Sequence, residues 1–200
     1  NLVLNDMSIP DFGQIIERII GSEQSSGRVG GKGAGLFIAS RILQQAAKND
    51  ALLKDIKTPR TWYIATDQIL DFIRYNRLEE LNSYKYNNAF YLRKTYETVV
   101  AKIKNASLPP KTETMLRLVL EDMGDTPLIL RSSSLLEDTY RGSFSGKYKS
   151  LFLSNRGTKQ ERLDAMKDAL LKIYASMYNP DSIQYRRERG LLNFAEQMGI

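Results

Sequence analysis

The stretch from Thr126 to Leu153, TPLILRSSSLLEDTYRGSFSGKYKSLFL, places the strongest restriction on the fold. Pro127 marks a turn, and the apolar run Leu128–Leu130 after it predicts a buried strand. A second apolar run, Leu151–Leu153, predicts another strand at the far end. A strand, a charged turn, a glycine-bearing loop and a second strand together predict a hairpin of the kind that can fold over a nucleotide.

The polar residues of this stretch favour contact with an anion. Arg131 ends the first strand and Ser132–Ser134 follow it, so one cation and three hydroxyls stand together as donors suited to phosphate oxygens. The loop Arg141–Lys147 contains two glycines, which let backbone N–H groups approach an anion closely. The alternative is a surface hairpin in which these residues are ordinary turn chemistry.

A second glycine-rich segment, RVGGKGAGL at residues 28–36, leads into a predicted helix that extends to about Lys48. Unpaired N–H groups and the positive end of the helix dipole attract anions at such a turn, and the Lys32 ammonium can reach the same anion. The segment is not a Walker A loop, because Gly33 follows Lys32 where Ser or Thr is required. It is not G-x-G-x-x-G, because Leu36 fills the last position. A simple turn that begins a helix is the alternative.

Composition limits the chemistry that these 200 residues can perform. The sequence has no histidine and no cysteine, which excludes imidazole bases, Ser-His-Asp triads and thiolate metal sites within it. The remaining groups, Lys, Arg, carboxylates, hydroxyls and backbone amides, suit phosphate handling better than acyl transfer. The apolar runs are too short to cross a bilayer, and no signal peptide is visible, so we expect a cytoplasmic protein.

The net charge of +6 raises the alternative of a nucleic-acid-binding domain. Its motivating features are the Tyr- and Lys-rich segment 71–104 and the basic run Arg186–Arg189. Acidic residues are interleaved along the chain, so we interpret the basic run as a solvated helix face. We interpret the tyrosines of segment 71–104 as the amphipathic walls of two packed helices.

The order of predicted elements favours a single unit over residues 1–200. Helices are predicted at about 11–20, within 71–104, at 108–123 ending before Gly124, at 159–178 and at 180–190, with a strand at Trp62–Ala65. No linker, internal repeat or low-complexity tract divides the chain. The fold class predicted is α+β. Because Asn1 opens the chain without a Met, we also expect a piece of a longer protein.

Several motifs occur in an order that resembles a known family. GGKGAGL followed by TWYIATDQIL, then LILRSSSLLED, SFSGKYKSLFL and IYASMYNPDSIQYRRERG, is similar to the N-terminal nucleotide-binding region of the pyruvate phosphate dikinase and phosphoenolpyruvate synthase family. The resemblance covers nearly the whole chain, although segment 71–104 does not align clearly and Ser134 replaces a small apolar residue. It implies the first lobe of an ATP-grasp fold, with a mixed or antiparallel sheet packed against helices.

The resemblance also implies a function. Such a lobe uses Mg-ATP to phosphorylate a histidine on a separate swivelling domain, and a distant barrel passes the phosphoryl group to pyruvate. Lys32 and Arg131 would be catalytic, with Lys32 on the ATP phosphates and Arg131 also stabilising the transferred group. The ATP-binding residues implied are Gly31, Lys32, Arg131, Ser132, Gly146 and Ser150. No metal ligand is assigned within the chain, because the Mg²⁺ carboxylate of the family belongs to the second lobe.

The expected partners are therefore ATP and the remaining domains of the same protein: the second ATP-grasp lobe, the phosphohistidine domain and the pyruvate-binding barrel. Neither nucleic acid nor a membrane is expected as a partner. This lobe alone is expected to be inactive. A non-catalytic ATP-binding sensor or scaffold is the second hypothesis, and the nucleic-acid-binding domain is the third.

Overall fold

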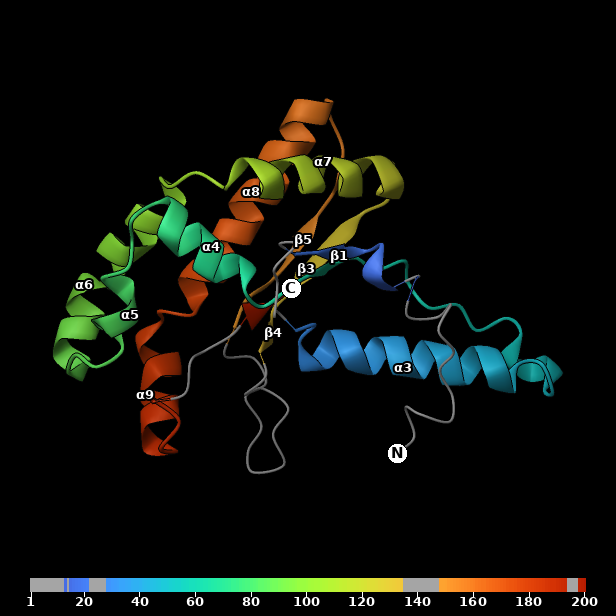
Figure 1. Ribbon diagram of the computed structural model, residues 1–200, viewed down its shortest axis with the longest axis horizontal. Coiled ribbons are helices and arrows are strands. Elements are labelled where there is room, and N and C mark those ends of the chain that lie inside the picture. Colours follow the sequence, from blue (N-terminus) through green and yellow to red (C-terminus); the bar gives the residue numbers. More distant parts are fainter. Residues whose placement is uncertain (1–12, 14, 22–27, 135–147, 194–197) are drawn as a thin grey trace.

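The computed structural model describes residues 13, 15–21, 28–134, 148–193 and 198–200 (Figure 1). The helices are α3 (Gly31–Ala46), α4 (Gln68–Tyr75), α5 (Leu81–Tyr84), α6 (Ala89–Lys104), α7 (Pro110–Met123), α8 (Lys159–Ser176) and α9 (Pro180–Glu188), with the 3-10 helix η1 (Ala51–Leu53). The strands are β1 (Ile19–Ile20), β2 (Tyr63–Ile64), β3 (Leu128–Arg131), β4 (Ser133–Ser134), β5 (Ser150–Leu153) and β6 (Met198–Gly199). The predicted α+β class is confirmed.

The predicted hairpin is present as strands β3 and β5, which pair antiparallel with Leu128 opposite Leu153 and Arg131 opposite Ser150. One face of the pair is packed inward and contributes the buried Leu130 to the core. Helix α8 lies against β5 on this side. The connecting loop that carries the predicted Gly146 lies outside the described residues.

Two further strand pairs join the N-terminal and C-terminal parts of the chain. Strand β1 pairs in parallel with β2, and β4 pairs antiparallel with β6. Ile64 of β2 and Ile200, just after β6, exchange backbone hydrogen bonds of 2.7 and 3.1 Å. The two pairs are therefore connected through the last residue of the chain. The predicted strand at Trp62–Ala65 is confirmed in the shorter form of β2.

The predicted helix over residues 11–20 is wrong at its C-terminal end, because Ile19 and Ile20 form strand β1. Ile20 is 1% exposed, and its carbonyl accepts a 2.9 Å hydrogen bond from the amide of Ala65. The apolar residues at 15, 16, 19 and 20 fit helical spacing, but a β-branched pair at the end of that run also suits a buried strand. Pairing with β2 decides in favour of the strand.

Helix α8 forms the centre of the hydrophobic core. Its wholly buried side chains include Leu163, Leu170 and Ile173, and α6 and α7 pack against it. In Figure 1, α4, α5, α6 and α9 gather on the left of the strands, whereas α3 projects to the right. None of the helices within the described residues has the length and apolar character needed to span a membrane.

The local signals that begin and end these helices explain why the predictions for 108–123, 159–178 and 180–190 are confirmed to within two residues. Thr158 and Glu161 form a reciprocal capping box at the start of α8. Gly124 ends α7 with a φ of 57°, a left-handed conformation that favours glycine. The segment 71–104 is helical as predicted, in α5, α6 and most of α4.

The basic run Arg186–Arg189 is only in part the solvated helix face that its sequence suggests, because Arg189 is exposed whereas Arg186 is buried. Arg186 is 3% exposed and donates to the Met177 carbonyl. Arg187 donates to the carbonyls of Lys85 and Asn87, which fastens α9 to the loop before α6. The carbonyl groups at the end of a helix have no hydrogen-bond partner within that helix. A guanidinium group has five N–H donors and can therefore bind such carbonyls.

A polar network fixes the turn that leads into β3. Asn155 is buried with a φ of 55°, and its side-chain amide donates 2.8 Å hydrogen bonds to the carbonyls of Gly124 and Thr126. Arg162 of α8 donates from Nε to Asn155 Oδ1 at 2.9 Å. The core helix therefore sets the position of the hairpin strand that carries Arg131.

The core packing predicts that substituting two different phenylalanines by Ala will have very different effects on the free energy of unfolding. Phe72 is 1% exposed and lies 5.4 Å from the Tyr174 ring centre, whereas Phe90 is 77% exposed on α6. We expect Phe72→Ala to lower the free energy of unfolding by about 3–5 kcal/mol, because it leaves a cavity in a packed core. Phe90→Ala is expected to change it by less than about 0.5 kcal/mol. Urea denaturation measures both, and equal effects would contradict this assignment of the core.

Candidate functional site

The glycine-rich turn at residues 28–33 is anchored to the end of β2. The Arg28 amide donates to Thr66 Oγ1 at 2.9 Å, and the Thr66 amide donates to the Arg28 carbonyl at 3.0 Å. Thr66 is wholly buried, so the Thr66 end of this pair of hydrogen bonds is shielded from water. Gly30 then serves as the N-cap of α3, and Gly31 is its first residue.

Lys32 joins this turn to the serines that follow β3. Its backbone amide donates to Ser133 Oγ at 3.0 Å, and its ammonium donates to the Ser132 carbonyl at 3.0 Å. The partners are about 100 residues apart in sequence. The structure thus brings together the two motifs predicted to meet a phosphate, and the Lys32 ammonium contacts the residue next to Arg131.

The close approach of the two segments requires glycine. A Cβ added at Gly30 would overlap the Ser133 carbonyl oxygen and side chain, and one added at Gly199 would lie 2.9 Å from the Gly30 amide nitrogen. Only a residue without a side chain permits such backbone contact. Gly30, Ser133 and Gly199 therefore form a junction of three backbone segments under the start of α3.

Arg131 and Ser150 lie opposite each other at one end of the hairpin, and both are exposed. Because side chains alternate along a strand, they share the outward face with the next pair of the same parity, Ile129 and Phe152. Phe152 is 82% exposed and Ile129 is 46% exposed. The outward face thus presents a cation and a hydroxyl beside an aromatic and an aliphatic side chain. We call these four residues the hairpin face.

The other predicted site residues fall in different surroundings. Ser132 is wholly buried, and among the described residues its hydroxyl has no hydrogen-bond partner, so its carbonyl is the group that meets Lys32. Gly31 is half-buried in the first turn of α3. Gly146 lies outside the described residues, and its predicted role in the closing loop stays a prediction.

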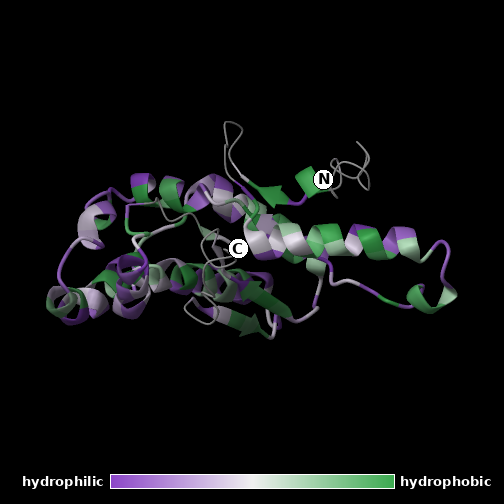
Figure 2. Cartoon of the chain, turned by 90° about the horizontal axis from the view of Figure 1, so that it is seen from below, coloured by the Kyte–Doolittle hydropathy of each residue, from purple (hydrophilic) through white to green (hydrophobic). Residues whose placement is uncertain are grey.

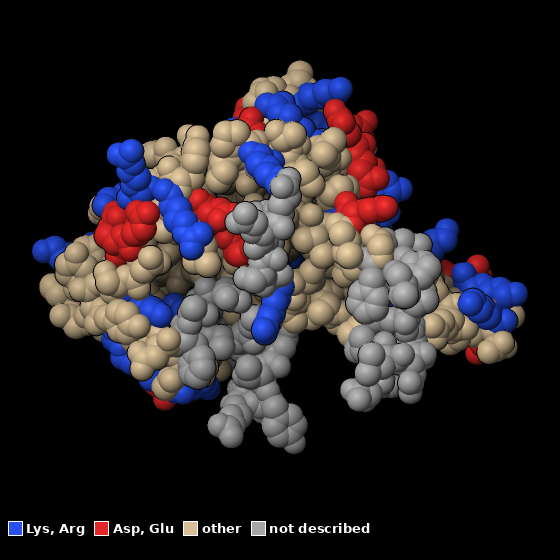
Figure 3. Space-filling view, in the orientation of Figure 1, with Lys and Arg blue, Asp and Glu red and all other residues tan. Residues whose placement is uncertain are grey.

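The electrostatics at the start of α3 favour an anion. No acidic residue occupies the first turn of the helix, so no side-chain carboxylate there offsets the positive end of its dipole. On the face shown in Figure 3, Lys and Arg are spread over several elements and alternate with Asp and Glu. Within the described part of the chain, no group of three or more carboxylates could hold a metal ion.

Sequence reasoning missed the strand pairing that assembles this site. Ser133 was expected only as a donor to phosphate, whereas it belongs to β4 and its hydroxyl accepts from the Lys32 amide. The partner strand β6 has only two residues, Met198 and Gly199, too few to show a periodic pattern. The one available signal was a glycine at each side of the junction, at residues 30 and 199.

The junction predicts that substitution by Ala will have opposite effects on stability at two glycines near the start of α3. Gly30→Ala introduces a methyl group into the space of Ser133, so we expect a loss of about 1–3 kcal/mol in stability. Gly35→Ala meets nothing within 4 Å and lies inside the helix, so a gain of up to about 1 kcal/mol is expected. Thermal unfolding of both variants measures the contrast. A Gly30→Ala variant as stable as the parent would contradict the close packing.

One family of known proteins matches most of the chain. The model of one protein family, described as pyruvate phosphate dikinase, AMP/ATP-binding domain, matches residues 26–200. No curated protein sequence matches the chain. The family match spans both segments that meet at Lys32, and it covers far more than half of the chain. The chain therefore belongs to the family of pyruvate phosphate dikinase AMP/ATP-binding domains.

Proposed function

We propose that this chain is the first lobe of an ATP-grasp unit in a dikinase-type phosphotransferase. In this proposal the lobe holds ATP while the phosphoryl group passes to a histidine on a separate swivelling domain and then to pyruvate. The full sequence contains no histidine, so the acceptor would lie outside these 200 residues. The second lobe, the histidine domain and the pyruvate-binding barrel would be its partners, and the enzyme would work in the cytoplasm.

One observation carries the proposal: Lys32 bonds to both Ser132 and Ser133, which follow Arg131 directly. Lys32, in a first helical turn that holds no acidic residue, is thereby held next to the segment that carries Arg131. Phosphoryl transfer spreads negative charge over the oxygens of the moving group, and such a transition state is stabilised by fixed cations and backbone amides. No nucleophile is needed from this lobe.

Each residue of the proposed site would have a role that follows from its position. Lys32 would bind the ATP phosphates as a point charge, and the hydrogen bond that its ammonium donates to the Ser132 carbonyl limits where the ammonium can move. Arg131 would offer its planar fork of donors from the exposed end of β3, with the Ser150 hydroxyl opposite it. Gly31 would supply a backbone amide. Mg²⁺ would accompany the phosphates, and its protein ligands would belong to the second lobe, as the resemblance to the dikinase family implies.

The two cations give the first functional test. Lys32→Ala and Arg131→Ala in the full-length protein are each expected to lower kcat/KM by about 10²–10³-fold, the usual cost of one lost donor to a developing anion. The assay supplies Mg-ATP with and without pyruvate and phosphate, and follows AMP, ADP and inorganic phosphate. Pyruvate-dependent AMP formation that each substitution reduces by this factor would support the proposal.

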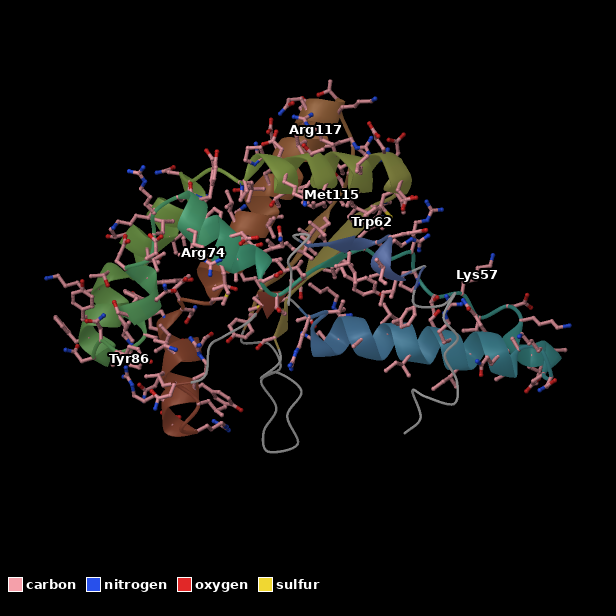
Figure 4. The ribbon with its side chains drawn as sticks, in the orientation of Figure 1. Lys57, Trp62, Arg74, Tyr86, Met115 and Arg117 are labelled. Atoms are coloured by element: carbon pink, nitrogen blue, oxygen red, sulfur yellow. The ribbon has the colours of Figure 1, made fainter. Side chains whose placement is uncertain are left out.

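Arg74→Ala is the matched control, because Arg74 is exposed on α4 and pairs with Asp71 of the same helix at 3.7 Å (Figure 4). It is expected to retain full activity. Unchanged phosphotransfer in both the Lys32 and Arg131 variants would exclude these residues from the site. Saturable ATP binding without turnover in the parent protein would instead favour the sensor or scaffold hypothesis.

The hairpin face suggests how the base of the nucleotide is held. Successive outward pairs on a strand lie two residues apart, about 6.8 Å along the hairpin. Phosphates at Arg131 and Ser150 would therefore place the ribose and base toward Phe152, the more exposed member of the neighbouring pair. An aromatic ring that is open to solvent offers a stacking surface for a planar base.

The proposed stacking surface can be tested by an experiment that distinguishes binding of the base from binding of the phosphates. Phe152→Ala is expected to weaken ATP binding by about 1–3 kcal/mol, the usual value of one base–aromatic stack, and to leave tripolyphosphate binding unchanged. Isothermal titration calorimetry of both ligands measures this. Phe90→Ala, which removes an equally exposed ring from α6, is expected to affect neither ligand. An equal loss for ATP and tripolyphosphate would show that Phe152 does not hold the base.

A further inference from the structure

A cavity of about 280 Å³ lies between α3, the segment before β1 and the segment that leads into β2. Residues on α3 line one wall, and residues 58–61 line the opposite wall. Ser40 and Thr58 hydrogen bond to each other at 3.0 Å across the two walls. The space is at the small end of the range for ligand sites, so it suits a small molecule.

The charge of this cavity has a single sign. Arg18, Arg41 and Arg60 contribute to its lining, and no Asp or Glu does so among the described residues. The three arginines come from three separate segments of the chain, so the fold brings three positive side chains to one concave surface. Convergence of like charges on a concave surface is typical of an anion site.

Two of the arginines are placed by contacts within the described structure. Arg41 donates to Gln44 Oε1 at 2.9 Å, and its guanidinium lies 5.5 Å from the centre of the Phe37 ring. Arg60 donates to the Asp122 carbonyl and pairs with its carboxylate at 3.3 Å. That carboxylate also accepts a 2.8 Å hydrogen bond from Trp62, which lies beside α7 (Figure 4). Because the Arg60 side chain is 54% exposed, this surface pair is readily exchanged for a ligand.

The charge of Arg18 reaches the floor of the cavity. Burial raises the pKa of the Tyr63 phenol, and the positive charge of Arg18 acts in the opposite direction. The apolar part of the lining includes Leu36 and Phe37 of α3. In Figure 2, hydrophobic residues alternate with hydrophilic ones along this helix, and none of its residues is fully buried. The cavity thus offers cations, hydroxyls and an apolar wall together.

We propose that this cavity is a second anion site, which binds a small phosphate monoester with its phosphate on the arginines and its carbon part against Leu36 and Phe37. The site is separate from the proposed nucleotide site, because Lys32 and Arg41 are nine residues apart on α3, about 14 Å along the helix. The inference rests on the cavity and its charges, and it would stand if the nucleotide proposal failed.

Calorimetric titration of the full-length protein with phenyl phosphate tests the site. Saturable binding is expected for the phosphate ester and not for phenol, which has the ring without the charge. Arg18→Gln and Arg41→Gln are each expected to weaken binding about tenfold or more, since each removes a charge-assisted contact. Circular dichroism of both variants checks that they are folded. Substitution of Arg18 is expected to disturb the fold less than substitution of Arg41, because Arg18 is exposed.

Two controls separate binding in this cavity from nonspecific charge attraction and from binding at the nucleotide site. Arg74→Gln removes the same charge from the surface of α4 and is expected to leave phenyl phosphate binding unchanged. Lys32→Ala is also expected to leave phenyl phosphate binding unchanged. Weaker binding by the Lys32→Ala variant would assign the phenyl phosphate to the nucleotide site. Absence of saturable binding in the parent protein, or unchanged affinity in the Arg18 and Arg41 variants, would overturn the proposal.

Discussion

The contact of Lys32 with Ser132 and Ser133 is the interaction on which the rest of the site depends. Its two hydrogen bonds of 3.0 Å join segments about 100 residues apart, and the backbones approach closely enough that Gly30 admits no side chain. Long-range contacts of this kind close a large loop, so they form only when the surrounding core holds both partners in place. Here that support comes from the core helix α8 below the hairpin and from the strand pairing around Ile64.

Two arrangements of charge follow from the position of α3. At its first turn, glycines and Lys32 meet the serines after Arg131, which suits the phosphates of a nucleotide. Further along, Arg41 lines a small cavity together with Arg18 and Arg60. The net charge of the chain does not distinguish these local sites, and the most basic stretch of sequence, at Arg186 and Arg187, instead fastens a helix to the core. The position of a Lys or Arg side chain in the fold therefore says more about its role than the density of basic residues in the sequence around it.

The sequence was sufficient to predict the hairpin strands and most helices, because each has a local signal such as a capping residue, a glycine stop or an apolar run. It failed at Ile19 and Ile20, where a helical spacing of apolar residues forms a strand with a distant partner. It also missed the pairing of β4 with β6, since two-residue strands have no period. The exposure of Phe152 could be known only from the register, which sets the side of the hairpin on which each residue lies.

A double-mutant cycle of Lys32→Ala and Arg131→Ala, with ATP affinity as the readout, tests the central claim most directly. If both cations hold one set of phosphates, each substitution changes the ligand position seen by the other. We predict a coupling energy of about 0.5–3 kcal/mol between them. Effects that add to within about 0.3 kcal/mol would contradict a shared phosphate site, because they would place the two residues at independent positions.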